Sequence, residues 1–463
     1  MSLENLENKL LSELTINQKR FGLFAFGFFQ FVVILAGISP GTDISQARNS
    51  FLSGENSDFL GIFAGWAYSL LPNGLIPWEI SLATIQMVSV ICAFQVELHK
   101  RYCDKRGFIF YVIFQYAALE FSAQQSRDGT LFAFLCLGLS FLRLTKRLNN
   151  KKTAVYVLYL SLALILIGLT FRPWMIPVAI VLIIFEIRGN RQETVLKNRH
   201  QWVFLLSIIF IPFSIEEGLS KILQTKETYP LQILLIHDLV SASCWSANLR
   251  TSEESILALK PLSNNPKFAT NLCQFFRPNT WQAVIGGASG SLLTDNFEPP
   301  ISITTNKIIY NGLFKSWLRI FINDPKTYLQ NKLMLSSQVF FASQTNIELS
   351  IFTPENVKIN KYFSTSYEVI HRLVHLPWII MSGLYLLTPG MMMIIYVLFF
   401  SRFIRSRVPM TSFWLIPTMA LVCIGWGTLT FVSDNARYLT SFVILTYFSI
   451  YSLNQRNKIG SNC

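Results

Sequence analysis

The chain has 463 residues, of which 51% are hydrophobic, 14% aromatic and only 14% charged. With a mean hydropathy of +0.40, it is too apolar to be an ordinary soluble enzyme. A formal net charge of +13 would suit a nucleic-acid partner, but the cations lie where the cytoplasmic loops of a membrane protein collect Lys and Arg. The composition therefore favours a membrane protein that does not bind nucleic acid.

Apolar residues come in runs close to the length of about 20 residues that a helix needs to cross a bilayer. This pattern predicts an all-α polytopic membrane protein with about ten transmembrane helices. The expected spans are residues 21–38, 76–94, 108–123, 130–142, 154–170, 171–186, 203–215, 376–400, 413–431 and 438–453.

Lysine and arginine mark one side of these spans. Gln18-Lys19-Arg20 precedes the first span, and no small-residue cleavage site follows it, so we expect an uncleaved signal anchor. Basic groups recur in every second loop, at 100–106, 143–152, 188–199, 402–407 and 456–458. The positive-inside rule then places both termini in the cytoplasm.

The stretch 216–375 lacks a sustained apolar run, and loops of such length are usually functional or domains in their own right. We expect an extracytoplasmic α or α+β domain here, inserted between transmembrane modules at 1–215 and 376–463. A first outer loop at 40–73 is expected to carry an interfacial helix near 58–71. Cys244 and Cys273 lie in the inserted domain, and the sequence leaves open whether they pair.

Ionisable residues gather on the outer side of this topology, most of them close to the end of a span. Charged groups held against hydrocarbon are costly and usually face a cavity or a partner, so their convergence predicts a site at the membrane surface. The group consists of Asp43, Arg127, Asp128, Arg172, His237, Asp238, Asp434 and Arg437.

Asp43 follows the first span in Ser39-Pro40-Gly41-Thr42-Asp43. Its carboxylate is suited to take the proton of an acceptor hydroxyl, or to hold a divalent cation, Mg²⁺ or Mn²⁺, that serves the transfer of a group. The alternative is a helix N-cap, because Ile-Ser-Gln-Ala follows the aspartate.

The arginines suit an anionic ligand, because the planar guanidinium can bind phosphate through two hydrogen bonds. For Arg127 and Arg172 the alternative is anchoring at the interface, and Arg437 has the alternative of pairing with Asp434. Asp128 is a candidate helix cap, acid/base group or metal ligand.

His237 and Asp238 are adjacent, and such a pair suits a metal site or acid/base chemistry. The alternative is a histidine that serves the structure alone. No GxGxxG, GxxxxGK[ST], GxSxG or HExxH motif occurs at the spacing that its chemistry needs.

Several short motifs resemble those of the integral-membrane glycosyltransferases of the C-type fold (GT-C), which use polyprenyl-phosphate-linked sugars. An aspartate follows the first span, and a charged turn, Arg127-Asp128-Gly129, opens the fourth. The remaining motifs are Trp317-Leu318-Arg319-Ile320, Asp324-Pro325-Lys326-Thr327-Tyr328-Leu329 and Asp434-Asn435-Ala436-Arg437-Tyr438.

The resemblance implies a GT-C-like fold in which Asp43 is the catalytic base and Arg127, Arg172 and Arg437 bind the donor phosphate. It implies inverting transfer to a glycan, lipid or protein acceptor in cell-envelope assembly. The active site would face outward from a bacterial inner membrane. Two other functions remain open on the sequence: an O-antigen polymerase or ligase, which also has many spans and one large outer loop, and a polytopic transporter.

Overall fold

The computed structural model describes residues 15–36, 42–54, 61–72, 78–98, 105–123, 126–145, 147–148, 150–188, 198–225, 229, 231–263, 272–273, 276, 285–286, 301–341, 376–377, 380–381, 386, 388–405, 410–430 and 439–449. This part of the chain is almost entirely helical. Its only strands are two residues long, β1 (Ile285–Gly286) and β2 (Ile301–Ser302), and they pair in parallel.

In the first half of the chain the structure describes ten helices: α2 (Ile16–Ala36), α3 (Thr42–Leu52), α4 (Ile62–Ser69), α5 (Trp78–Glu97), α6 (Lys105–Ala123), α7 (Arg127–Thr145), α8 (Lys151–Phe171), the short η3 (Pro173–Met175), α9 (Ile176–Arg188) and α10 (Asn198–Ile222). The later helices are α11 (Gln232–Trp245), α12 (Leu249–Leu259), η4 (Lys260–Leu262), α14 (Lys307–Asn323), α15 (Pro325–Phe341), α18 (Pro389–Arg405) and α19 (Met410–Thr430). A further apolar helix spans Leu439–Ser449.

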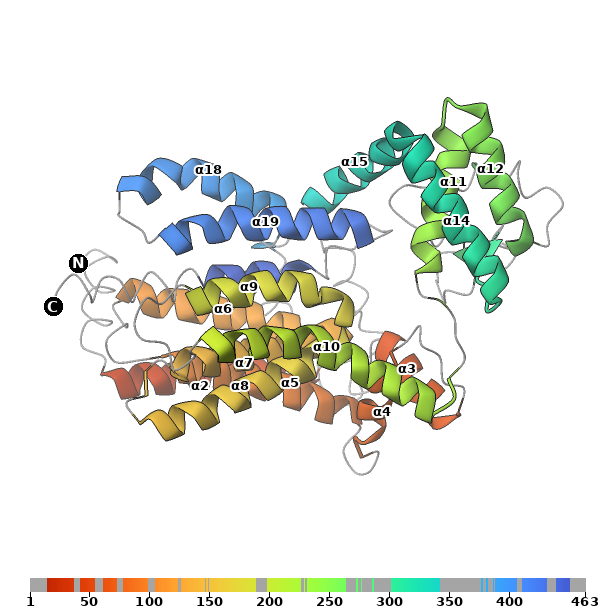
Figure 1. The fold of residues 1–463 in the computed structure, drawn as a ribbon. Coiled ribbons are helices and arrows are strands. Elements are labelled where there is room, and N and C mark those ends of the chain that lie inside the picture. The colour runs from red at the N-terminus through yellow and green to blue at the C-terminus, as the bar shows by residue number, and fades with distance from the viewer. Residues whose placement is uncertain are drawn as a thin grey trace.

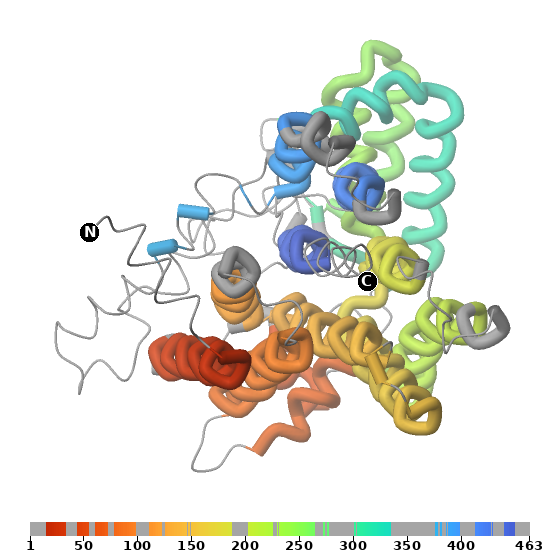
Figure 2. The backbone as a smooth tube through the Cα atoms, turned by 90° about the vertical axis from the view of Figure 1, so that its left-hand side faces the viewer, coloured from red at the N-terminus to blue at the C-terminus, as the bar shows by residue number. Residues whose placement is uncertain are grey.

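The long helices form one bundle in which α7 is central and α5, α7, α8 and α10 run side by side (Figure 1). Figure 2 looks along these helices and shows the N-terminal ones, red to yellow, on one side and α18 and α19, blue, on the other. Helix α8 packs closely on α7, where a Cβ at Gly138 would lie 2.7 Å from Ile165 Cγ1. Ser161 Oγ donates a hydrogen bond of 2.8 Å to the Gly138 carbonyl. Small residues permit this close approach, as they do between membrane helices.

Four helices in the described part are long and apolar enough to cross a membrane: Trp78–Glu97, Arg127–Thr145, Lys151–Phe171 and Trp202–Ile222. Large apolar side chains face outward on the bundle; Phe21 on α2 is 71% exposed and Phe210 on α10 is 62% exposed. Such surfaces are rare on soluble monomers and suit lipid. The chain is thus a helical protein whose long apolar helices fit a membrane protein.

The other expected spans fall on helices as well, but whether these cross a membrane stays a prediction. In the span expected at 376–400, α18 begins at Pro389, and residues 376–377 and 380–381 before it are also helical. The helix starts there because Thr388 caps it: the Met391 amide donates to Thr388 Oγ1 at 3.3 Å. Proline is also well suited to the first turn of a helix.

Helices α11, α12 and α14 form a second group with a hydrophobic core of their own, separate from the core of the bundle. Buried Leu239, Leu259, Leu313 and Ile320 belong to it. In Figure 1 this group lies at the same end of the long helices as α3 and α4, and α15 leads from it towards α19. The boundary expected at residue 216 falls inside α10, which continues to Ile222.

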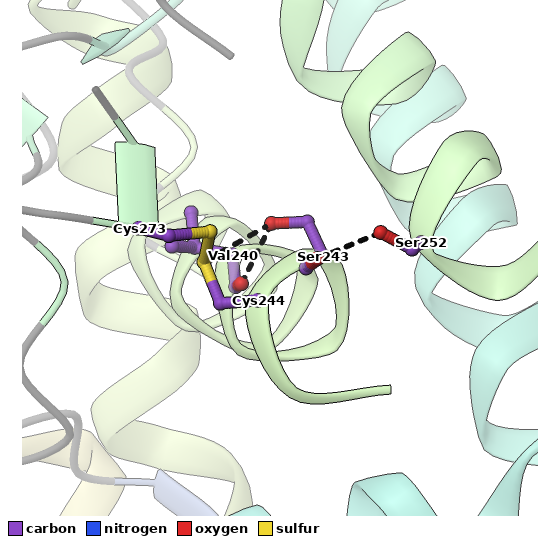
Figure 3. The surroundings of a disulfide bond; sticks show 5 residues. All are labelled: Val240, Ser243, Cys244, Ser252 and Cys273. Atoms are coloured by element: carbon purple, nitrogen blue, oxygen red, sulfur yellow. Dashed lines mark hydrogen bonds between the residues drawn. A yellow bond between two sulfur atoms is a disulfide. The ribbon is translucent and has the colours of Figure 1, made fainter. Parts of the chain in front are cut away.

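A disulfide joins Cys244, at the end of α11, to Cys273 (Figure 3). The turn that precedes Cys244 is held by two further hydrogen bonds of 2.7 Å. Ser243 Oγ donates to the Val240 carbonyl, and Ser252 Oγ of α12 donates to the Ser243 carbonyl. The disulfide closes a loop with a sequence separation of 29 residues, so it restricts the unfolded chain.

Replacing Cys244 and Cys273 together by serine is expected to lower the free energy of unfolding of this group by about 2–4 kcal/mol, because the loop is no longer closed in the unfolded state. Limited proteolysis across a temperature series measures the change. In the wild type, reduction should add two thiols per chain that react with a labelling reagent under denaturing conditions. The matched control is Cys92→Ser, which removes a free thiol; equal proteolysis of both variants would contradict the prediction.

Candidate functional site

Helix α3 begins at Thr42, so Asp43 lies within its first turn rather than before it. An acidic residue at this position is favoured by the partial positive charge of a helix N-terminus. The side chain of Asp43 is outside the described residues. The rest of α3 packs on α4: a Cβ at Gly65 would lie only 2.7 Å from the Ala47 carbonyl oxygen, so this contact depends on glycine.

One small core cluster ties α3 to the ends of the long helices. It contains Ile44 and Ala47 of α3, Tyr68 of α4 and Phe171, the last residue of α8. The rings of Tyr68 and Phe171 stack with centroids 5.4 Å apart. The residue after Asp43 and the residue before Arg172 therefore belong to one packed cluster.

The first turn of α7 presents Arg127 and Asp128, and both are buried. Ser126 caps this helix, since its Oγ accepts a hydrogen bond of 3.1 Å from the Gly129 amide. Asp128 was one candidate for that cap. Its carboxylate instead lies in the first turn, where the helix dipole favours a negative charge, and it is directed at a residue of the next helix.

Asp128 and Arg172 form a two-point ion pair. Arg172 Nη2 donates to Asp128 Oδ2 at 3.1 Å, and Arg172 Nε lies 2.9 Å from Asp128 Oδ1. The aspartate side chain is 2% exposed and the arginine side chain 15% exposed. Both carboxylate oxygens thus face the guanidinium.

A polar chain runs beside this pair. Tyr68 Oη and Thr130 Oγ1 share a hydrogen bond of 3.2 Å, and Gln86 Nε2 donates to Thr130 Oγ1 at 2.7 Å. Burial raises the pKa of the Tyr68 phenol, against the lowering effects of Thr130, Arg127 and Arg172. Tyr68 therefore stays neutral and acts as a hydrogen-bonding group.

Arg127 lies against the start of α4. Gly61 has φ +79, and a Cβ there would lie 3.1 Å from Arg127 Nη1 and 3.4 Å from Glu216 Oε1. The Phe63 amide donates to Glu216 Oε2 at 3.1 Å, so a carboxylate of α10 caps α4. Glu216 was not among the site residues predicted from the sequence. Its position just after the apolar run 203–215, on the side expected to face outward, is the signal that could have identified it.

His237 and Asp238 lie elsewhere, buried in the α11 group. Asp238 Oδ1 lies 2.9 Å from Lys332 Nζ and accepts from Asn331 Nδ2 at 3.0 Å, while Oδ2 accepts from Trp317 Nε1 at 2.9 Å. Burial alone would raise the pKa of Asp238, but the Lys332 ammonium brings it below its usual range. His237 Nδ1 is 3.9 Å from Asp238 Oδ1, too far for a hydrogen bond.

The structure thus brings Arg127, Asp128 and Arg172 together near the start of α3, and places His237 and Asp238 in a different core. Arg437 and Asp434 lie outside the described residues. Within the described ranges, no three His, Cys, Asp or Glu side chains gather in a way that would hold a metal ion.

A second group of buried charges lies within the bundle, at the opposite end of α7. Arg143 Nη1 lies 3.0 Å from Glu97 Oε1, and Arg147 Nη2 lies 2.8 Å from Glu97 Oε2. Arg143 also pairs with Glu186 of α9 and donates to Ser449 Oγ at 2.7 Å. The sequence shows these arginines only as markers of the cytoplasmic side, and their partners lie in other helices.

Comparison of the chain with protein family models, with curated proteins and with solved structures gives no match. The resemblance to GT-C glycosyltransferases therefore rests on the short motifs in the sequence, and the site is interpreted from its own geometry.

Proposed function

We propose that this protein is a membrane glycosyltransferase that moves a sugar from a polyprenyl-phosphate donor to an acceptor hydroxyl on the extracytoplasmic face. One observation carries the proposal: Ile44, next to Asp43, and Phe171, next to Arg172, belong to the same packed cluster. The start of α3, which carries Asp43, and the end of α8, which precedes Arg172, are thereby held at one end of the bundle.

The proposed reaction follows from these groups. The Asp43 carboxylate takes the proton of the acceptor hydroxyl as that oxygen forms a bond to the anomeric carbon. The bond between this carbon and the phosphate oxygen breaks, and its electron pair leaves with the polyprenyl phosphate. Attack opposite to the leaving group inverts the anomeric centre. Arg127, with Arg437 as a further candidate, stabilises the negative charge of the leaving phosphate.

Arg172 has a different part in this scheme. Its guanidinium is balanced by Asp128 at 2.9 Å, so it adds little net positive charge. The pair joins the start of α7 to the end of α8 and fixes the turn that carries Arg127. We assign Arg172 to positioning.

The disulfide supports the proposed orientation. Disulfides form and persist in oxidising compartments, and Cys244 is paired with Cys273 in the α11 group. The group lies at the same end of the bundle as α3 and α4 (Figure 1). If the α11 group is extracytoplasmic, the site at Asp43 is extracytoplasmic as well. The proposed location is the outer face of a bacterial inner membrane.

The experiment is sugar transfer by membranes that carry the wild type, Asp43→Asn or the control Glu217→Gln, with radiolabelled polyprenyl-phosphate sugars as donors. Loss of general-base catalysis is expected to slow transfer by about a hundredfold or more. Glu217 is an exposed carboxylate paired with Lys221, so its variant should retain transfer. Thermal stability of each variant is measured alongside, because loss of folding would also abolish transfer.

Transfer by Asp43→Asn at the wild-type rate would overturn the assignment of the base. Transfer from pyrophosphate-linked but not from monophosphate-linked donors would identify a polymerase or ligase instead. Uptake of a solute into vesicles without transfer would identify a transporter.

A further inference from the structure

We infer that α14 and α15 form a membrane-surface element, whose exposed apolar stripe enters the headgroup region of the bilayer and whose flanking cations bind anionic lipid phosphates. The inference rests on the chemistry of this surface and does not depend on the proposed sugar transfer.

Helix α14 has two apolar faces. Leu313 and Ile320 are buried in the core shared with α11 and α12. The second face is exposed and repeats at i, i+4, i+7 and i+8, which places its members on one side of the helix. It consists of Phe314 (40% exposed), Leu318 (40%), Phe321 (46%) and Ile322 (64%).

Helix α15 also carries exposed apolar side chains. Leu329 and Leu333 are 56% and 65% exposed and are one turn apart. Trp317 joins the two helices, because its ring centroid lies 6.0 Å from that of Phe321 and 6.0 Å from that of Tyr328.

The exposed charged side chains beside the apolar stripe of α14 are all cationic. Lys315, Arg319 and Lys326 are exposed next to it. The only acidic residue in α14 and α15, or between them, is Asp324, and its carboxylate accepts hydrogen bonds from Ser246 Oγ at 2.7 Å and Thr327 Oγ1 at 2.9 Å. A basic flank beside an exposed apolar face is the pattern of helices that lie in the plane of an anionic membrane surface.

The surface is continuous with the bundle. Helix α15 packs against both α18 and α19, which carry apolar segments, and Figure 1 shows it leading from α14 to the end of α19. A bilayer around the bundle would therefore begin beside α15. Helix α12 offers the contrast: it has an exposed leucine, Leu257, but also Glu253 and Glu254, so it suits contact with water.

The test uses the full chain in vesicles of phosphatidylcholine and phosphatidylglycerol. An environment-sensitive fluorophore is attached through Leu318→Cys or Leu329→Cys, with Leu257→Cys on α12 as the matched exposed leucine; the native free cysteines are replaced and Cys244 and Cys273 kept. At positions 318 and 329 we expect blue-shifted emission, quenching by brominated lipid and protection from a water-soluble quencher. At position 257 we expect no blue shift, no quenching by brominated lipid and full access for the water-soluble quencher.

The role of the cations is tested by Lys315→Gln combined with Arg319→Gln. We expect this change to reduce lipid quenching at position 318 in vesicles that contain phosphatidylglycerol more than in vesicles of phosphatidylcholine alone. Equal behaviour of positions 318 and 257 would overturn the inference. Crosslinking between the 318 positions of two chains, without lipid quenching, would also overturn it and identify an interface between copies.

Discussion

Replacing Arg143 by methionine is expected to lower the free energy of unfolding by about 3–5 kcal/mol, because removing one partner of a buried ion pair leaves an uncompensated charge. The Arg143 side chain is 1% exposed and binds Glu97 and Glu186. Its guanidinium also lies over the Phe448 ring, 4.9 Å from the centroid. One side chain thus connects α5, α7, α9 and the helix Leu439–Ser449. Thermal unfolding in detergent measures the loss.

Two further variants test whether the loss of stability comes from the unpaired charge. Arg143→Met combined with Glu186→Met should be less destabilised than the sum of the single variants, because replacing both charges by apolar groups removes the unpaired carboxylate. Glu217→Gln is the exposed control, since its pair with Lys221 has side chains 69% and 75% exposed and should not change stability measurably. Strict additivity of the two methionine changes would show that the pair is not coupled.

The positions of the helices could be predicted from the sequence, because apolar runs of membrane length are a local signal. The run expected at 76–94 overlaps α5 from Trp78 onward, and the runs expected at 130–142 and 154–170 lie within α7 and α8. Within the span expected at 376–400, α18 begins at Pro389, where Thr388 caps it, and this start is a local signal that an apolar run does not show. The inserted stretch, expected as an α or α+β domain, is mostly helical where the structure describes it, and Ile301 of β2 belongs to its core.

The partners of the charged residues could not be predicted in the same way. Arg172 and Asp128 are 44 residues apart, and Asp238 and Asn331 are 93 apart. Which side chains meet depends on the rotation of each helix about its axis and on how it packs with its neighbours. The sequence therefore identifies Arg127, Asp128 and Arg172 as a charged group on one side, while the pairing of Arg172 with Asp128 emerges only in the fold.

Asp238→Asn is expected to destabilise the α11 group by about 3–5 kcal/mol at neutral pH. The Asp238 carboxylate joins three helices, because Trp317 of α14 and Asn331 and Lys332 of α15 all contact it from within 3.0 Å. The asparagine side chain keeps a similar shape but leaves the Lys332 ammonium, 5% exposed, without its anionic partner. Limited proteolysis of the α11 group across a temperature series measures the loss. Glu254→Gln, in an exposed pair with Arg250, is the control in the same group.

The pH dependence of stability distinguishes the contribution of the Asp238 charge from that of its shape and packing. The pKa of Asp238 is lowered in the folded protein, so its contribution to stability is fully present above the pKa of an unfolded aspartate, about 3.9. The contribution is lost as the pH falls below that value and through the lowered pKa of the folded state. The wild type should therefore approach the stability of Asp238→Asn in strong acid, while the two differ most at neutral pH. A difference that stays constant from pH 7 into this acid range would show that Asp238 acts through packing and neutral hydrogen bonds rather than through its charge.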